Sequence, residues 1–143
     1  MEAAPRSSLI GLLVRFGLVG AVNTALGLAV VLLVEFGLKA SPVVANAAGY
    51  GVGFAVGFGL NRGFVFKSQA GVSAAGPRYL AAVALCYGLN LAVLQGLRAV
   101  LPAGDLARVA AQLCAMGTYT VTLFLLSRYW VFAAARSSGG RTR

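Results

Sequence analysis

The sequence predicts an all-α membrane protein in which four transmembrane helices form two helical hairpins. Three observations support this prediction. Hydrophobic residues make up 59% of the 143 positions and charged residues only 10%, whereas a soluble domain carries about 25% charged residues. The uncharged residues gather in four long runs, and one nine-residue stretch occurs twice. A soluble domain of this size could not bury so much apolar surface, so the composition excludes that class.

Each of the four uncharged runs is bounded by charged residues and is long enough to cross a bilayer. The runs span residues 16–34, 40–61, 79–97 and 109–127, so the shortest contain 19 residues. A helix of that length reaches about 28 Å, close to the hydrocarbon thickness of about 30 Å. A helix also satisfies its backbone groups internally, as lipid requires. The first run is too long for the apolar part of a signal peptide and lacks a small-x-small cleavage site, so we expect a transmembrane helix there.

The chain contains an internal repeat with an offset of 66 residues. Residues 58–66 read FGLNRGFVF and residues 124–132 read FLLSRYWVF, with five of the nine positions identical. Each copy ends an apolar run with one arginine and then aromatic residues, which is typical of a helix leaving a bilayer. We therefore expect a single transmembrane domain over residues 1–143, built from halves at about 12–67 and 78–133. Residues 68–77 are expected to form a cytoplasmic linker and residues 134–143 a basic, disordered tail.

The distribution of lysine and arginine predicts the topology of the four spans. Nine of these residues fall on one side of the membrane, namely Arg6, Arg15, Arg62, Lys67, Arg78, Arg128, Arg136, Arg141 and Arg143. The other side has three, namely Lys39, Arg98 and Arg108. The positive-inside rule then predicts that both termini and the linker are cytoplasmic. The two halves would form a parallel repeat in a multi-pass protein of the inner, cytoplasmic membrane.

Small residues inside the spans predict close helix packing. Gly49, Gly53 and Gly57 recur at four-residue spacing in the second span, and such a stripe lets another helix approach closely in lipid. We expect tight helix packing and a homo-oligomer formed through this stripe. A second interpretation is that glycines let this helix bend during transport.

Polar side chains inside the spans need partners because they are costly in lipid. A polar seam through the bundle would offer a hydrophilic headgroup partners at successive depths. The candidates for this seam are Asn23, Asn46, Asn61, Asn90 and Gln112, of which Asn46 and Gln112 are equivalent at the offset of 66. The alternative is ordinary hydrogen bonding between helices, worth about 0.6 kcal/mol for each bond.

The sequence lacks the residues that several kinds of chemistry need. There is no histidine, and the only acidic residues are Glu2, Glu35 and Asp105. No acid–base pair, catalytic triad or metal cluster can be assembled from these, so we expect no enzymatic activity and no cofactor or metal. No carboxylate lies in the middle of a span, which argues against a proton-driven exporter. The net charge is +9, but the basic residues separate apolar runs, so we expect no nucleic-acid binding.

Several short motifs in a fixed order resemble those of a known family. Residues 15–24 read RFGLVGAVNT; Asn46 and the glycine-rich span follow, and then Asn61-Arg62 and FVF at 64–66. The second half continues from Arg78-Tyr79 through Asn90 to SRYWVF at 127–132. Over roughly residues 12–133 the chain resembles the GtrA-like family. The resemblance implies a small four-helix protein of cell-surface polysaccharide synthesis that moves polyprenyl-phosphate-linked sugars or assists their glycosyltransferase.

The lipid implied by this resemblance carries a phosphate at the headgroup level, where four arginines are expected. Arginine binds phosphate bidentately and stays charged. Arg15 and Arg78 are expected to begin their helices, where a cation opposes the helix dipole but an anion meets free N–H groups. We therefore predict Arg15 and Arg78 as phosphate ligands, supported by Arg62 and Arg128. The alternative is that all four serve only as positive-inside anchors.

Two functions remain open at this point. The first is translocation, or flipping, of a polyprenyl-phosphate-linked sugar across the cytoplasmic membrane for polysaccharide synthesis or glycosylation. The second is a non-transporting adaptor that anchors or recruits a polyprenyl-phosphate glycosyltransferase. The expected partners are therefore the sugar lipid, a membrane glycosyltransferase and a second copy of the chain. Short connections between the spans favour transport because they offer little docking surface.

Overall fold

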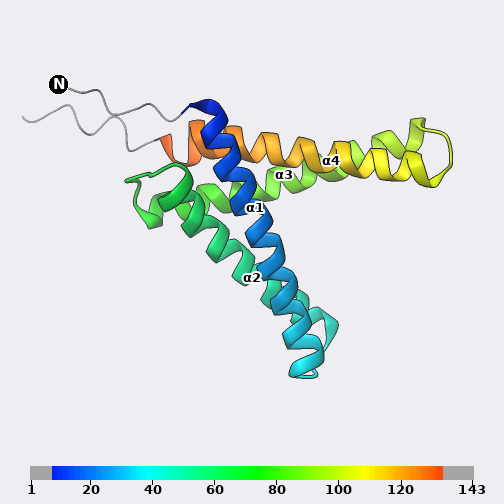
Figure 1. Ribbon diagram of the computed structural model, residues 1–143, viewed down its shortest axis with the longest axis horizontal. Helices are drawn as coiled ribbons and strands as arrows, with labels where there is room; N and C mark the ends of the chain where they lie inside the picture. Colours follow the sequence, from blue (N-terminus) through cyan, green and yellow to red (C-terminus); the bar gives the residue numbers. More distant parts are fainter. Residues whose placement is uncertain (1–7, 134–143) are drawn as a thin grey trace, which may run out of the picture. The chain divides into compact units, whose positions relative to one another are not determined.

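The computed structural model describes residues 8–133, which form helices and the short connections between them. The chain divides into two compact units, Met1–Gln69 and Ala70–Arg143. Each unit contains two helices that lie side by side and run in opposite directions (Figure 1). The predicted basic tail, residues 134–143, lies outside the described residues.

The first unit consists of α1 (Leu9–Leu32) and α2 (Pro42–Leu60). Each helix continues into one π-helical turn, η1 (Leu33–Gly37) after α1 and η2 (Asn61–Val65) after α2. Each helix is preceded by a serine, Ser8 or Ser41, whose hydroxyl accepts a hydrogen bond from a backbone N–H of the first turn. Such caps satisfy donors that have no partner inside the helix.

Glycine on α2 allows α1 to approach closely. A Cβ added at Gly49 would lie 2.9 Å from the carbonyl oxygen of Gly27 and 2.5 Å from Cγ2 of Val31. A Cβ at Gly53 would lie 3.6 Å from Nδ2 of Asn23. Gly49, Gly53 and Gly57 are all buried. Within this unit the glycine stripe faces α1, so the stripe does not supply the free self-association surface on which the expected homo-oligomer was based.

The second unit consists of α3 (Val72–Val100), α4 (Asp105–Leu126) and a π-helical turn, η3 (Ser127–Val131). Its helices pack through small side chains, with Ala75, Ala82 and Cys86 of α3 and Ala111 and Ala115 of α4 all buried. α3 begins inside the segment that the sequence predicted as a linker. Residues 72–77 are helical and contain alanines, which favour helix. Pro77 lies inside the helix, where it has no N–H to donate to the carbonyl of Ser73 four residues earlier.

Four helical segments are long and apolar enough to cross a membrane: Leu9–Gly37, Pro42–Val65, Val72–Val100 and Asp105–Val131. The shortest has 24 residues and therefore reaches about 36 Å, beyond a hydrocarbon core of about 30 Å. Their outward surfaces carry large apolar side chains such as Ile10, Leu28, Leu85 and Leu113. Surfaces of this kind suit lipid, so the predicted all-α membrane class with four spanning helices is confirmed.

Candidate functional site

The duplicated sequence stretch corresponds to a duplicated backbone geometry. η2 and η3 begin 66 residues apart, at Asn61 and Ser127. In each, the N–H that follows the π turn donates to the carbonyl five residues earlier: Phe66 to Asn61 at 2.9 Å, and Phe132 to Ser127 at 3.0 Å. Such turns are rare and are frequently found at functional sites. η1 ends α1 in the same way, so the π turn by itself does not define a site.

A buried polar residue opens each of these two turns. Asn61 is 4% exposed and Ser127 is fully buried. The Asn61 amide donates to the Gly57 carbonyl oxygen at 2.8 Å. The Ser127 hydroxyl oxygen is buried without a hydrogen-bond partner among the described residues. The two halves therefore differ chemically at the first residue of the π turn, which is asparagine in the first unit and serine in the second.

Aromatic contacts bring the start of one helix to the end of the other within each unit. In the first unit the rings of Phe16 and Phe66 lie 6.2 Å apart in an edge-to-face arrangement. In the second unit the rings of Tyr79 and Phe132 also lie 6.2 Å apart. Such pairs stabilise a contact by about 0.5–1.5 kcal/mol beyond area burial. They place the arginine neighbours of these residues at one end of each unit.

The four predicted arginines form one pair in each unit. Arg15 and Arg62 lie at the same end of the first hairpin, and Arg78 and Arg128 lie at the same end of the second. All four are half-buried. The guanidinium of Arg15 lies over the Phe64 ring, 5.6 Å from its centre. The guanidinium of Arg128 lies 5.2 Å from the Tyr129 ring centre, and its Nη1 is buried without a hydrogen-bond partner among the described residues.

The expectation that Arg15 and Arg78 begin their helices is wrong. α1 begins at Leu9 and α3 at Val72, so each arginine is the seventh residue of its helix. It lies six positions after the first helical residue, or about 9 Å along the axis. The free N–H groups are confined to the first turn. The helix dipole therefore gives no reason to rank Arg15 and Arg78 above Arg62 and Arg128 as anion ligands.

The five residues of the predicted polar seam lie in different environments. Asn23 is half-buried against α2, and its Oδ1 is buried without a hydrogen-bond partner among the described residues. Asn61 is buried in the same hairpin, and Asn90 is half-buried in the second unit. Asn46 and Gln112 are exposed, and Asn46 donates to the Pro42 carbonyl of its own helix at 3.0 Å. Asn23 and Asn61 both face the interior of the first hairpin.

Aromatic residues have a larger part in this site than the sequence analysis assigned to them. From the sequence, Phe64, Phe66 and Phe132 are expected only to anchor helix ends at the membrane interface. In the structure Phe64 contacts an arginine, and Phe66, Tyr79 and Phe132 hold helix ends together. The duplicated spacing of arginine and aromatic residues was the signal that could have identified them. Residues 8–133 contain no cluster of three or more His, Cys, Asp or Glu side chains that could hold a metal ion.

Comparison with known proteins gives the family. A family model described as "GtrA/DPMS, transmembrane domain" matches residues 15–132. Neither a curated protein nor a solved structure matches the chain. The matched range begins within the first spanning helix, includes the other three, and contains both arginine–aromatic ends described above. The chain belongs to the GtrA/DPMS transmembrane-domain family.

Proposed function

We propose that this protein moves a polyprenyl-phosphate-linked sugar across the cytoplasmic membrane, for cell-surface polysaccharide synthesis or glycosylation. Membership of the GtrA/DPMS transmembrane-domain family supports a role in handling such lipids. One observation carries the proposal further. Each unit presents two half-buried arginines beside aromatic rings at a single end. That arrangement suits an anion at headgroup depth better than it suits water-exposed topology signals.

The phosphate is the group that these arginines would bind. A guanidinium presents a planar set of donors that matches phosphate bidentately, and it stays charged when partly desolvated. Arg128 has a buried Nη1 without a partner among the described residues, and a buried unsatisfied donor costs about 1–3 kcal/mol. A phosphate oxygen would remove that cost once the side chain moves far enough to expose Nη1. We assign Arg15, Arg62, Arg78 and Arg128 equally to the phosphate.

The polar seam has a narrower role in this proposal. Asn23 and Asn61 are the interior candidates for contact with the sugar or its phosphate as the headgroup crosses, because both face the interior of one hairpin. Asn90 is the candidate in the second unit. Asn46 and Gln112 are exposed on the outside of their hairpins, so they would contact the headgroup only if it moved along that outer surface.

The proposed topology is a parallel repeat with both termini in the cytoplasm. The excess of nine basic residues over three supports it. Because each hairpin begins and ends at its arginine end, both arginine pairs would lie at the cytoplasmic headgroup level. The substrate would then be collected where cytoplasmic glycosyltransferases release it. We infer that the protein is a transporter and performs no catalysis itself.

Reconstitution into liposomes tests this function. The purified chain is inserted with a fluorescent polyprenyl-phosphate sugar, and transbilayer movement is followed by quenching of the outer leaflet. We expect movement well above the protein-free rate, and a large loss in the Arg62→Gln/Arg128→Gln double variant. Movement at the lipid-only rate, with the protein correctly inserted, would overturn translocation.

The alternative is an adaptor for a membrane glycosyltransferase. Gly88 and Gly96 of α3 are exposed, and a Cβ at either would meet nothing within 4 Å. This surface is open to a helix of another protein, since small residues favour close approach in lipid. Co-reconstitution with the glycosyltransferase distinguishes the two functions. An adaptor would raise the synthesis of the sugar lipid without accelerating its movement.

A further inference from the structure

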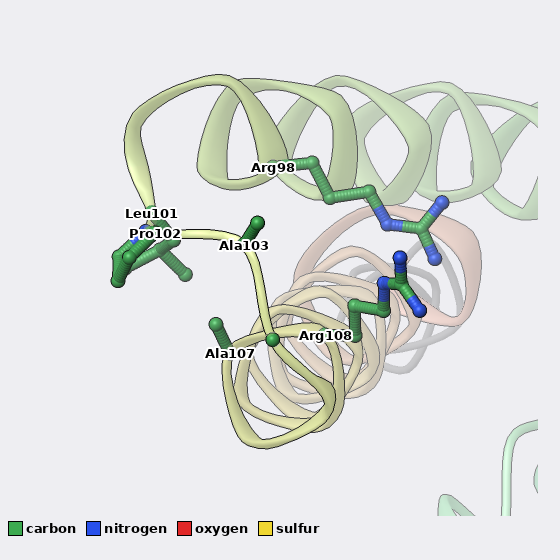
Figure 2. A pocket seen from close by; sticks show the side chains of 7 residues that line it. Arg98, Leu101, Pro102, Ala103, Ala107 and Arg108 are labelled. Carbon is green, nitrogen blue, oxygen red and sulfur yellow. The ribbon is translucent and has the colours of Figure 1, made fainter.

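The connection between α3 and α4 carries a second pair of arginines, at the end of this unit opposite to Arg78 and Arg128. Arg98 lies in the last turn of α3 and Arg108 in the first turn of α4. Figure 2 shows their guanidinium groups extending toward each other from the two helices. Together with the intervening loop they line a pocket of about 440 Å³, whose other lining residues are Leu101, Pro102, Ala103, Gly104 and Ala107. Binding pockets for small molecules span about 300–1,000 Å³.

Two exposed guanidinium groups that face each other attract an anion between them. The only acidic side chain in this part of the fold is Asp105, whose Oδ1 lies 3.3 Å from Nη1 of Arg108 in an exposed ion pair. Exposed pairs of this kind contribute little. Arg98 forms no hydrogen bond or ion pair with any of residues 8–133. The loop therefore keeps one net positive charge, and one guanidinium has all its donors available.

The pocket suits a phosphate group attached to something larger. Its walls are apolar or small, so the two guanidinium groups supply its cationic donors. The first turn of α4 follows Gly104 and has no side-chain cap, so its N–H groups add to the attraction for an anion. A volume of about 440 Å³ leaves room beyond the phosphate for the group that carries it.

The distance along the helices places this pocket at headgroup depth. Arg78 and Arg98 are 20 residues apart on α3, and Arg108 and Arg128 are 20 residues apart across α4 and η3. At about 1.5 Å per residue each separation is about 30 Å, which equals the usual hydrocarbon thickness. When the Arg78 end lies at one headgroup level, the pocket lies at the other. The corresponding turn of the first unit carries Glu35 and Lys39 and no arginine.

We propose that Arg98 and Arg108 together bind the phosphate of an anionic lipid at the membrane face opposite to Arg78 and Arg128. The second unit would thus offer a phosphate site at each of its two ends, while the first unit has one only at its Arg15 end. Binding at this pocket does not depend on translocation. A failure of this proposal can therefore be distinguished from a failure of the proposed function.

Native mass spectrometry of the full chain in detergent micelles tests the proposal, with phosphatidylglycerol as the probe and inorganic phosphate as competitor. We expect Arg98→Gln and Arg108→Gln each to reduce by one the number of phosphatidylglycerol molecules that stay bound, because the affinity of this one site falls about tenfold or more when its charge-assisted hydrogen bonds are lost. Lipid bound at the other arginine pairs should remain. The matched control is Lys39→Gln, which removes one positive charge from the corresponding turn of the first unit and should leave binding unchanged. Displacement by inorganic phosphate would identify the phosphate alone as sufficient, and its failure would show that the lipid is required.

Comparison of the single and double variants shows whether the two arginines share one phosphate site or only attract anions independently. If both guanidinium groups hold one phosphate, the double variant should lose little more than either single variant. Arg98→Lys keeps the charge without the planar fork and should still lose several-fold in affinity; it also serves if Arg98→Gln does not fold. Wild-type binding by Arg98→Lys and Arg98→Gln, losses no larger than that of Lys39→Gln, or strictly additive losses would overturn the proposal.

Discussion

The guanidinium carbon of Arg15 lies 5.6 Å from the centre of the Phe64 ring. The arginine belongs to α1 and the ring to the π turn that follows α2. A cation over an aromatic face is held in place without losing its hydrogen-bond donors, which remain directed outward. The contact therefore aligns an arginine from one helix with the end of the other and leaves it able to bind an anion.

Removing the ring should release Arg15. We expect Phe64→Leu to weaken binding of a polyprenyl-phosphate sugar by about two- to fivefold, since an exposed cation–π contact contributes about 0.5–1 kcal/mol. The matched control is Phe36→Leu, which changes an exposed ring in η1 at the other end of the same unit. Equal effects of the two substitutions on binding would contradict a specific role for Phe64.

The four arginines should respond alike to lysine. Lysine preserves the positive-inside charge but replaces a planar fork with a point charge. Because Arg15 and Arg78 lie in the second turn of their helices, they have no dipole-based difference from Arg62 and Arg128. We expect each Arg→Lys variant to insert normally and to lose about tenfold or more in sugar-lipid affinity, as for one lost charge-assisted bond of about 1.5–3 kcal/mol. Wild-type affinity in all four purified variants would mean that these arginines only orient the protein in the membrane and do not bind the phosphate.

The close approach of α1 and α2 should make Gly49 intolerant of a side chain. Gly49→Ala places its methyl group against the Gly27 carbonyl oxygen and Val31, and such overpacking costs about 1–3 kcal/mol. Gly51→Ala is the control, since a Cβ there meets nothing within 4 Å and alanine stabilises a helix by about 0.5–1 kcal/mol relative to glycine. In thermal unfolding in detergent, the unfolding temperature should therefore be highest for Gly51→Ala, intermediate for the wild type and lowest for Gly49→Ala. A Gly49→Ala protein as stable as wild type would mean that the helices do not pack this closely.

Reporter fusions test the membrane topology. A reporter after Arg143, or one inserted at Gln69 in the short connection between the units, should report the cytoplasm. A reporter inserted at Gly104, between α3 and α4, should report the opposite side. The physical basis is the excess of nine lysines and arginines over three. Placement of the Gln69 and Gly104 reporters on one side would be incompatible with α3 spanning the membrane.

Much of the fold could be predicted from residue composition and spacing. Four uncharged runs imply four spanning helices, because bilayer thickness sets their minimum length and lipid requires internal backbone hydrogen bonding. The helix ends could not be predicted in this way. Charged residues mark where the hydrocarbon core ends, but a helix can continue through the headgroup region, as α1 does before Arg15 and α3 before Arg78.

The sequence by itself determined the class of the protein, the number of spans and the pairing of arginine with aromatic residues at each half's end. These properties depend on hydropathy and on residue order along one chain. Only the tertiary structure decided which surfaces meet. The glycine stripe indicates that some helix comes close, but contact with Gly27 identifies α1 as that helix. Arg98 and Arg108 are separated by a loop whose path no periodicity describes, so their approach depends on how α3 and α4 pack.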